Sequence, residues 1–193
     1  MERRWQSYGN TPTHIMATQC SYRFASREDV PTIYSFLREG SSEQDPESKP
    51  KVTEAKLLDT LSFIESSKDV RSGPSFTPGF AKTLLLISPE GDIAGMAMFF
   101  YNYSTWSAEP GICLEELFVS NRYRRRGYAG LLIKRLATEA QELGGTKLEW
   151  NCYRSNEPAL RFYDSLGAKR MEHWVTLKLD KEAMDQLAKA EKK

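Results

Sequence analysis

The sequence is poor in the residues that build metal sites and disulfide frameworks. Its 193 residues include only two histidines and three cysteines. His14 and His173 are too few and too far apart to form a zinc site, so no metal is expected. An odd number of widely spaced cysteines, Cys20, Cys113 and Cys152, argues against a disulfide framework. Free thiols are typical of a reducing compartment, so we expect a cytoplasmic protein.

The chain also lacks a large excess of either charge and any long apolar run. Lysine and arginine total 27, and aspartate and glutamate total 26, which leaves a net charge of +1. Dedicated nucleic-acid binders usually carry a strong basic excess, so nucleic acid is not an expected partner. No apolar run approaches the roughly 18 residues that a membrane span needs, and the first residues lack the apolar segment of a secretory signal. We therefore expect a soluble globular protein without a membrane partner.

The length of the chain suits one domain with a substantial core. We expect a flexible N-terminal extension over residues 1–18, a folded domain over residues 19–182 and a helical tail over residues 183–193. Apolar residues that recur three and four positions apart predict helices over residues 28–38, 52–64, 127–143, 156–166 and 180–191. Shorter apolar or alternating runs predict strands over residues 20–24, 82–88, 93–103, 112–119, 147–153 and 174–179.

The order of these elements indicates the fold class. Residues 40–50 and 66–78 are rich in polar residues, glycine and proline, so they are predicted loops. Residues 89–92 predict the turn of an antiparallel hairpin. A strand, a helix and a strand over residues 112–153 imply a parallel pair with a right-handed crossover. The expected fold is α/β (α+β), with one mixed sheet flanked by helices.

A short arginine-rich and glycine-rich segment stands where the strand over 112–119 leads into the helix over 127–143. It consists of Arg124, Arg125, Arg126, Gly127, Tyr128, Ala129 and Gly130. The first N–H groups of a helix have no intrahelical partner and lie at its positive end, so they bind phosphate well. Gly127 leaves room for a phosphate to approach, and the arginines attract it. The alternative is a solvated basic loop before an ordinary helix.

Two motifs resemble the GNAT superfamily of acetyltransferases. Residues 124–129 match its acyl-CoA signature [Q/R]-x-x-G-x-[G/A], and the Asn156, Pro158 and Tyr163 of a short helix match its second signature. The resemblance covers roughly residues 20 to 180. It implies a mostly antiparallel central sheet with a splayed parallel strand pair at the acyl-CoA site, acetyl-CoA as the cosubstrate, and a homodimer.

The resemblance is closer to the branch that acetylates diamines and thialysine. Residues 95–106 look like the hairpin of that branch, and residues 114–119 look like its central acidic strand. The chain departs from the branch at residues 40–45, which lack the usual tyrosine of a Tyr-Glu pair, and at Ser155, where an aromatic residue is common. The acceptor implied is a small primary amine, either polyamine-like or a lysine analogue. Peptide or protein acetylation and a non-catalytic acyl-CoA-binding regulator are the alternatives.

The resemblance implies that the amine attacks the thioester directly. A free alkylamine has a pKa near 10.4, so it must lose a proton, and the departing thiolate gains from receiving one. Tyr163 is expected to be the general acid, although a half-buried core aromatic beside Phe162 is the alternative. Glu115 is expected to take the proton from the amine and, with Glu116, to attract the cation. Surface carboxylates paired with arginines are the alternative for both.

The remaining expectations concern contacts with the two substrates. The resemblance implies that the coenzyme contacts Leu117, Phe118, Val119, Arg124, Arg125, Arg126, Gly127, Tyr128, Ala129, Gly130, Asn156, Pro158, Ala159 and Tyr163. The backbone N–H of Leu117 or Val119 is expected to bind the carbonyl oxygen, whereas Asn156 either meets the pantetheine arm or caps its helix. Trp106 is expected at the acceptor, although plain strand packing would explain the aromatic residues of its hairpin.

Overall fold

The computed structural model describes residues 19–44, 47, 50–65 and 74–189. The predicted N-terminal extension, residues 66–73 of the predicted loop over 66–78 and residues 190–193 of the predicted tail lie outside the described residues. The chain divides into two compact units, Met1–Asn151 and Cys152–Lys193.

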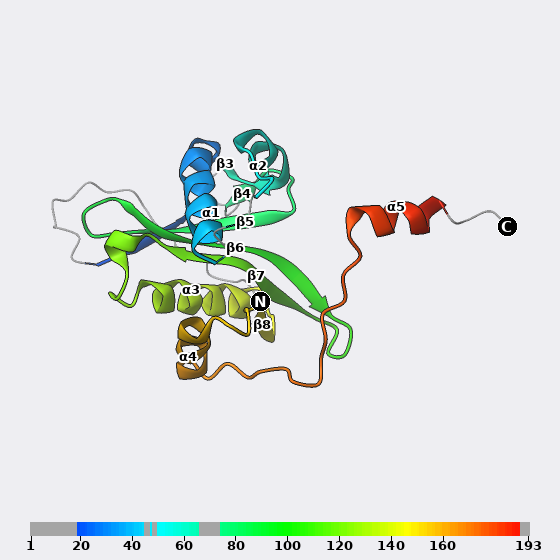
Figure 1. The fold of residues 1–193 in the computed structure, drawn as a ribbon. Coiled ribbons are helices and arrows are strands. Elements are labelled where there is room, and N and C mark those ends of the chain that lie inside the picture. The colour runs from blue at the N-terminus through cyan, green and yellow to red at the C-terminus, as the bar shows by residue number, and fades with distance from the viewer. Residues whose placement is uncertain (1–18, 45–46, 48–49, 66–73, 190–193) are drawn as a thin grey trace, which may run out of the picture. The chain divides into compact units, whose positions relative to one another are not determined.

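The first unit is built on a six-stranded sheet (Figure 1). Its main strands are β1 (Ser21–Phe24), β5 (Ala81–Ile87), β6 (Ile93–Ser104), β7 (Glu109–Val119) and β8 (Lys147–Trp150), which lie side by side in this order. These neighbours pair antiparallel except for β7 and β8, which are parallel as predicted. The short β2 (Leu61–Ser62) adds a parallel pair beside β5, and β3 (Ile64–Glu65) and β4 (Ser75–Phe76) form a separate two-stranded sheet.

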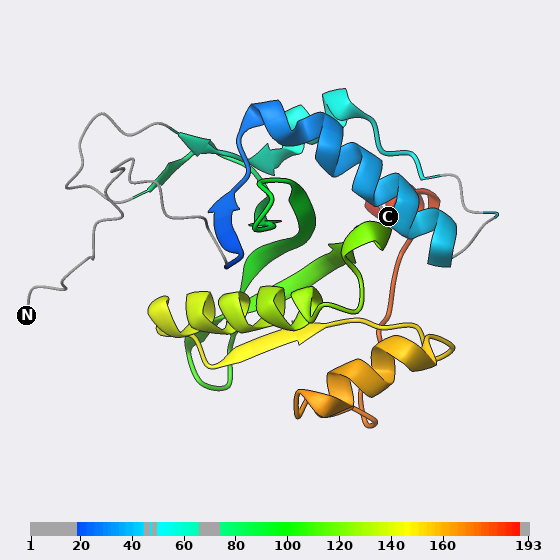
Figure 2. The same ribbon diagram turned by 90° about the vertical axis from the view of Figure 1, so that its left-hand side faces the viewer.

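Helices cover both faces of this sheet. The helices α1 (Val30–Gln44) and α2 (Glu54–Thr60) lie on one face, and α3 (Tyr128–Glu142) lies on the other (Figures 1 and 2). Short 3₁₀ turns, η1 (Arg27–Asp29) and η2 (Asn121–Tyr123), precede α1 and α3. Each long helix buries an apolar stripe against the sheet: Val30, Ile33 and Phe36 from α1, and Leu132, Ile133, Leu136 and Ala140 from α3.

The local signals for helix ends and turns are confirmed. Thr53 caps α2 by accepting the N–H of Lys56 at 3.2 Å. Gly91 in the β5–β6 turn and Gly144 after α3 both have positive φ angles, of 93° and 76°. A glycine reaches this left-handed region without the steric cost of a Cβ atom. These positions end their elements where the sequence predicts.

Two predictions for the α1–α2 region are wrong. The first helix continues to Gln44, through residues 40–44 that were expected in a loop. Glycine disfavours a helix by roughly 1 kcal/mol, but here the buried Gly40 allows close packing on Phe118, so tertiary contact overrides propensity. The second helix ends at Thr60, and Leu61 pairs instead with β5. A short apolar run suits either element, and its neighbours decide between them.

The second unit contains two helices, α4 (Glu157–Ser165) and α5 (Lys181–Lys189). The predicted strand over 174–179 is wrong, because these residues have no strand partner in the part of the chain that the structure describes. Trp174, Val175 and Leu177 are between 66% and 88% exposed. A strand needs a neighbouring strand for its backbone hydrogen bonds, and alternation in sequence does not supply one. None of the described helices has the length and hydrophobicity to span a bilayer.

Candidate functional site

The parallel pair of β7 and β8 opens toward the end of β7. Their pairing stops at Leu114 opposite Trp150, whereas β6 continues to pair with the other edge of β7 as far as Val119. On the side of β7 that faces β8, residues 115–119 therefore have no strand partner among the described residues. Backbone N–H and C=O groups on such an edge can bind an extended ligand. This stretch includes Leu117, Phe118 and Val119, which the sequence assigns to the coenzyme.

A β-bulge separates the two adjacent glutamates on this strand. Met98 pairs with Glu116, but the next residue of β6, Phe99, pairs with Leu114, so Glu115 is the extra residue. A bulge changes the direction of a side chain and often lies beside a functional site. Glu115 is exposed and Glu116 is half-buried. The two carboxylates thus occupy different environments.

The carboxylate of Glu116 lies against α1, at the point where that helix carries a glycine. An ideal Cβ atom on Gly40 would stand 3.4 Å from Oε1 of Glu116 and 3.3 Å from the ring of Phe118. Burial raises the pKa of Glu116 above its ordinary value, and the nearby charge of Glu115 raises it further. A carboxylate with a raised pKa is a stronger base than an ordinary glutamate, and this is typical of proton-transfer sites.

Further carboxylates lie along the neighbouring strands. The thiol of Cys113 contacts Glu115 at 3.9 Å, and its pKa is raised by burial first and then by Glu115 and Glu149. Glu149 on β8 accepts hydrogen bonds from Asn102 at 2.5 Å and from Lys147 at 3.0 Å. The charge of Glu149 is compensated by Lys147, so Glu115 and Glu116 are the residues that make this part of the sheet acidic, which favours a cationic ligand.

The predicted phosphate-binding turn adopts an unusual backbone conformation. Arg125 and Gly127 both have left-handed φ angles, of 63° and 78°. Turns that alternate in hand direct successive N–H groups toward one point, where an anion can bind. Apart from chain neighbours and the backbone of α3 itself, no atom of the described residues lies within 4 Å of an ideal Cβ placed on Gly127 or Gly130, so the space before the turn is open. This conformation fits a pyrophosphate group.

The first turn of α3 has no side-chain cap among the described residues. Gly127 stands at its N-cap position and has no side chain to accept the free N–H groups. The N-termini of α2 and α4 differ, since Thr53 and Asn156 cap them with side-chain oxygens. The first N–H groups of a helix need an acceptor from outside the helix. A bound anion would supply that acceptor at α3.

Three arginines around this turn already have carboxylate partners. Arg122 pairs with Asp92 at 3.2 Å, Arg124 with Glu43 at 2.6 Å, and Arg126 with Glu90 at 3.8 Å. No hydrogen bond or ion pair is found for the guanidinium of Arg125 within the described residues. Arg125 is therefore the arginine of this turn whose charge is uncompensated.

Two of the predicted coenzyme residues use their side chains for packing. The ring of Tyr128 stacks on Tyr123 with centroids 6.1 Å apart, and it is buried. The ring of Phe118 is buried against Phe36 of α1 at 4.8 Å. Only the backbone of these two residues is available to a ligand, and a backbone role leaves no signature in the sequence.

The residues of the second signature lie in the second unit. Asn156 accepts the N–H of Ala159 at 3.2 Å, so it caps α4, and Pro158 occupies the first turn of that helix. The ring of Tyr163 is half-buried and lies 5.2 Å from that of Phe162. The capping role of Asn156 is thus confirmed, whereas its contact with the coenzyme stays a prediction.

Trp106 lies apart from the two glutamates within the chain. It is 92% exposed in the turn between β6 and β7. Glu116 stands seven positions after Glu109, the first residue of β7, which at about 3.3 Å per residue corresponds to about 23 Å. The structure therefore does not bring the indole and Glu116 together within one chain.

Sequence reasoning missed Glu149 as a residue around this site, and it treated Gly40 and Glu43 only as members of a departing loop over residues 40–45, without their helical packing or contacts. A glycine in the middle of an amphipathic helical pattern often has a packing reason, and that signal would have found Gly40. Glu43 and Glu149 are ordinary acidic residues in sequence. Their importance arises from contacts with residues that are distant along the chain.

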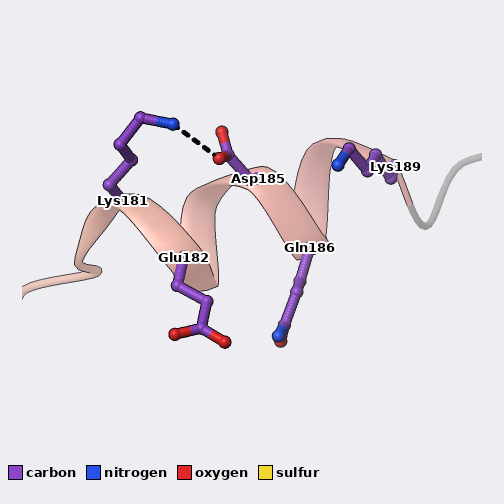
Figure 3. Close-up of a pocket in the computed structure, with 5 residues that line it drawn as sticks. All are labelled: Lys181, Glu182, Asp185, Gln186 and Lys189. Atoms are coloured by element: carbon purple, nitrogen blue, oxygen red, sulfur yellow. Dashed lines mark hydrogen bonds and ion pairs between the residues drawn. The ribbon is translucent and has the colours of Figure 1, made fainter.

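A surface hollow on α5 offers no comparable chemistry. Lys181, Glu182, Asp185, Gln186 and Lys189 line it, and all five come from this one exposed helix (Figure 3). Lys181 and Asp185 pair across it at 2.8 Å, one helical turn apart. In the described parts of both units, no three histidine, cysteine or acidic side chains are grouped to hold a metal ion.

Comparison with known proteins agrees with the geometry of the first unit. The model of the acetyltransferase (GNAT) family matches residues 44–168. An L-ornithine N5-acetyltransferase of Arabidopsis thaliana is 31% identical over 133 residues, which are 61% of this chain and 58% of that protein. A thialysine N-epsilon-acetyltransferase of Caenorhabditis elegans is 35% identical over 98 residues, which are 49% of this chain and 61% of that protein. The matches thus span about three fifths of the length of these curated relatives.

Solved structures share the fold at low sequence identity. An integron cassette protein from the mobile metagenome of V. cholerae superimposes with a TM-score of 0.67 and 18% identity, over 89% of this chain and 98% of that one. The family match extends from the end of α1 across the bulged strand, the uncapped turn and α4. From this coverage and the geometry of the turn, we conclude that the chain belongs to the acetyltransferase (GNAT) family.

Proposed function

We propose that the protein transfers the acetyl group of acetyl-CoA to a primary amine of a small cationic molecule. One observation carries this proposal. The uncapped N-terminus of α3, with its left-handed Gly127, adjoins the connection from the open edge of β7, which also bears the half-buried Glu116. An anion site and a base on one continuous stretch of chain suit a reaction between an anionic thioester and a cationic amine.

The coenzyme is held mainly by backbone groups. The N–H groups of Tyr128, Ala129 and Gly130 bind the pyrophosphate, and Arg125 adds its uncompensated charge. The pantetheine arm lies along residues 115–119 of β7, whose free edge supplies hydrogen bonds to its amides. The N–H of Leu117 or Val119 binds the carbonyl oxygen as negative charge develops there.

We propose Glu116, in place of the Glu115 expected from the sequence, as the base that removes the proton from the amine. An alkylamine with a pKa near 10.4 is almost fully protonated at neutral pH, and only the neutral form attacks. The raised pKa of the half-buried Glu116 suits it to accept a proton. Glu115 is exposed, and its charge draws the cation toward the strand.

Tyr163 donates the proton that the departing thiolate takes up. Transfer from a tyrosine with a pKa near 10 to a thiolate near 8.5 is uphill by about 2 kcal/mol, which is small for a proton shared while the C–S bond breaks. This role rests on the Asn156, Pro158 and Tyr163 motif. We also propose that Asn156, Pro158 and Ala159 contact the pantetheine arm.

The acceptor is a polyamine-like molecule or an amino acid that carries a second amine. Two relatives are named for ornithine and for thialysine. The adjacent carboxylates of Glu115 and Glu116 support a cationic acceptor. We further propose a cytoplasmic homodimer that binds neither nucleic acid nor membrane. The exposed Trp174, Val175 and Leu177 support dimerisation, because association would remove their apolar surface from water.

A thiol-release assay with acetyl-CoA tests the proposed function. The acceptors are spermidine, spermine, thialysine, ornithine, aminoglycosides and lysine peptides. We expect thiol release with at least one small amine and much less with the peptides. Faster turnover of peptides would support protein acetylation, and coenzyme A binding without thiol release from any amine would support a non-catalytic regulator.

The pH dependence of kcat tests the base. Glu116 must be ionised to accept a proton, so kcat falls as the pH drops through its pKa, which lies above the ordinary 4.5. We expect Glu116→Gln to lower kcat about tenfold or more and to remove this acid limb. Glu115→Gln is the matched control: it keeps the limb but moves it to lower pH, because a neighbouring negative charge is lost, and it raises KM for the amine. An unchanged acid limb in Glu116→Gln would rule out this base.

Replacing Tyr163 with phenylalanine tests the general acid. The change removes one hydroxyl and keeps the ring beside Phe162. We expect kcat to fall about tenfold or more, with little change in the affinity for coenzyme A. Phe162→Tyr is a control for packing in the same helix. Turnover of Tyr163→Phe equal to the wild type would show that another group protonates the thiolate.

A further inference from the structure

The first arginine of the turn is bound by α1. Nη2 of Arg124 lies 2.6 Å from Oε2 of Glu43, and its Nε donates to the carbonyl oxygen of Val119 at 2.9 Å. Asn121 donates to the other oxygen of Glu43 at 3.3 Å. Both carboxylate oxygens of Glu43 are thus held by the connection between β7 and α3.

This ion pair is accessible to a competing anion. The side chains of Arg124 and Glu43 are 38% and 41% exposed, so water and solutes reach both. Exposed pairs are usually worth less than about 1 kcal/mol, whereas arginine binds phosphate through strong charge-assisted hydrogen bonds. A phosphate at the turn is therefore able to displace the carboxylate.

The last turn of α1 also contacts the acceptor side of the site. Gly40 stands three residues before Glu43, and residues three apart lie on neighbouring parts of a helix surface. Gly40 packs on Phe118 and near Oε1 of Glu116. The ring of Phe118 in turn lies 5.7 Å from the guanidinium of Arg124. The last turn of α1 thus contacts the phosphate-binding turn through Glu43 and lies beside the proposed base through Gly40.

We propose that Glu43 is a built-in competitor of the coenzyme phosphates for Arg124. In the free protein it neutralises this arginine and ties the end of α1 to the turn. When the coenzyme binds, its phosphate takes Arg124 and Glu43 is released. This inference rests on one part of the proposed function, which is the binding of coenzyme A at this turn.

Calorimetric titration with coenzyme A tests this competition without any acetyl transfer. We expect Glu43→Gln to bind coenzyme A about two- to fivefold more tightly than the wild type, because the coenzyme phosphate no longer has to break an exposed ion pair. Glu39→Gln is the matched control. Glu39 lies one turn earlier on α1 and accepts a hydrogen bond from Ser35, and its loss leaves affinity unchanged.

A double-mutant cycle with Arg124→Gln shows whether the effect acts through the pair. We expect Glu43→Gln to change nothing when Arg124 is already absent. Equal tightening in both backgrounds would mean general charge repulsion and would overturn the inference. Unchanged or weaker binding by Glu43→Gln alone would also overturn it, because a merely structural tie weakens binding when it is cut. Failure of the wild type to bind coenzyme A would instead contradict the proposed function.

Discussion

The first backbone N–H groups of α3 lack an acceptor within the described chain, and the rest of the site is arranged around them. Gly127 holds a left-handed conformation at the N-cap and contributes no side chain to satisfy them. The apolar stripe of α3, which includes the fully buried Leu132 and Leu136, fixes the helix against the sheet. These N–H groups are therefore presented by a rigid scaffold, and an anion such as a pyrophosphate would satisfy them.

The sheet supplies the other half of the site through an interruption of its own hydrogen bonding. The pairing of β7 with β8 stops at Leu114, a bulge follows at Glu115, and Glu116 lies under α1 where Gly40 makes room for it. A continuous ladder would occupy the backbone groups of residues 115–119. The same interruption thus frees donors for an extended ligand and places two carboxylates in different environments.

Features with local causes were predictable from the sequence. Thr53, Asn156 and Gly144 act at helix ends through their own side chains or backbone, and the turn at Gly127 follows from a strand, a glycine and an amphipathic helix. Features that depend on distant contacts were not. Residues 40–44 are helical because Gly40 packs on Phe118, and Glu43 matters because Arg124 is beside it. The alternation over 174–179 predicted a strand, but no described strand pairs with it.

The central claim is that the turn before α3 binds the coenzyme, and two glycines of the chain allow a direct test. Gly127 and Gly144 stand at opposite ends of α3, with similar left-handed φ angles and open space in front of both. Alanine in this conformation costs roughly 1–2 kcal/mol at either position. Titration of Gly127→Ala and Gly144→Ala with coenzyme A separates stability from binding. We expect a similar loss of stability in both variants and a loss of affinity for coenzyme A, about tenfold, in Gly127→Ala alone. Equal affinity in the two variants would contradict the central claim.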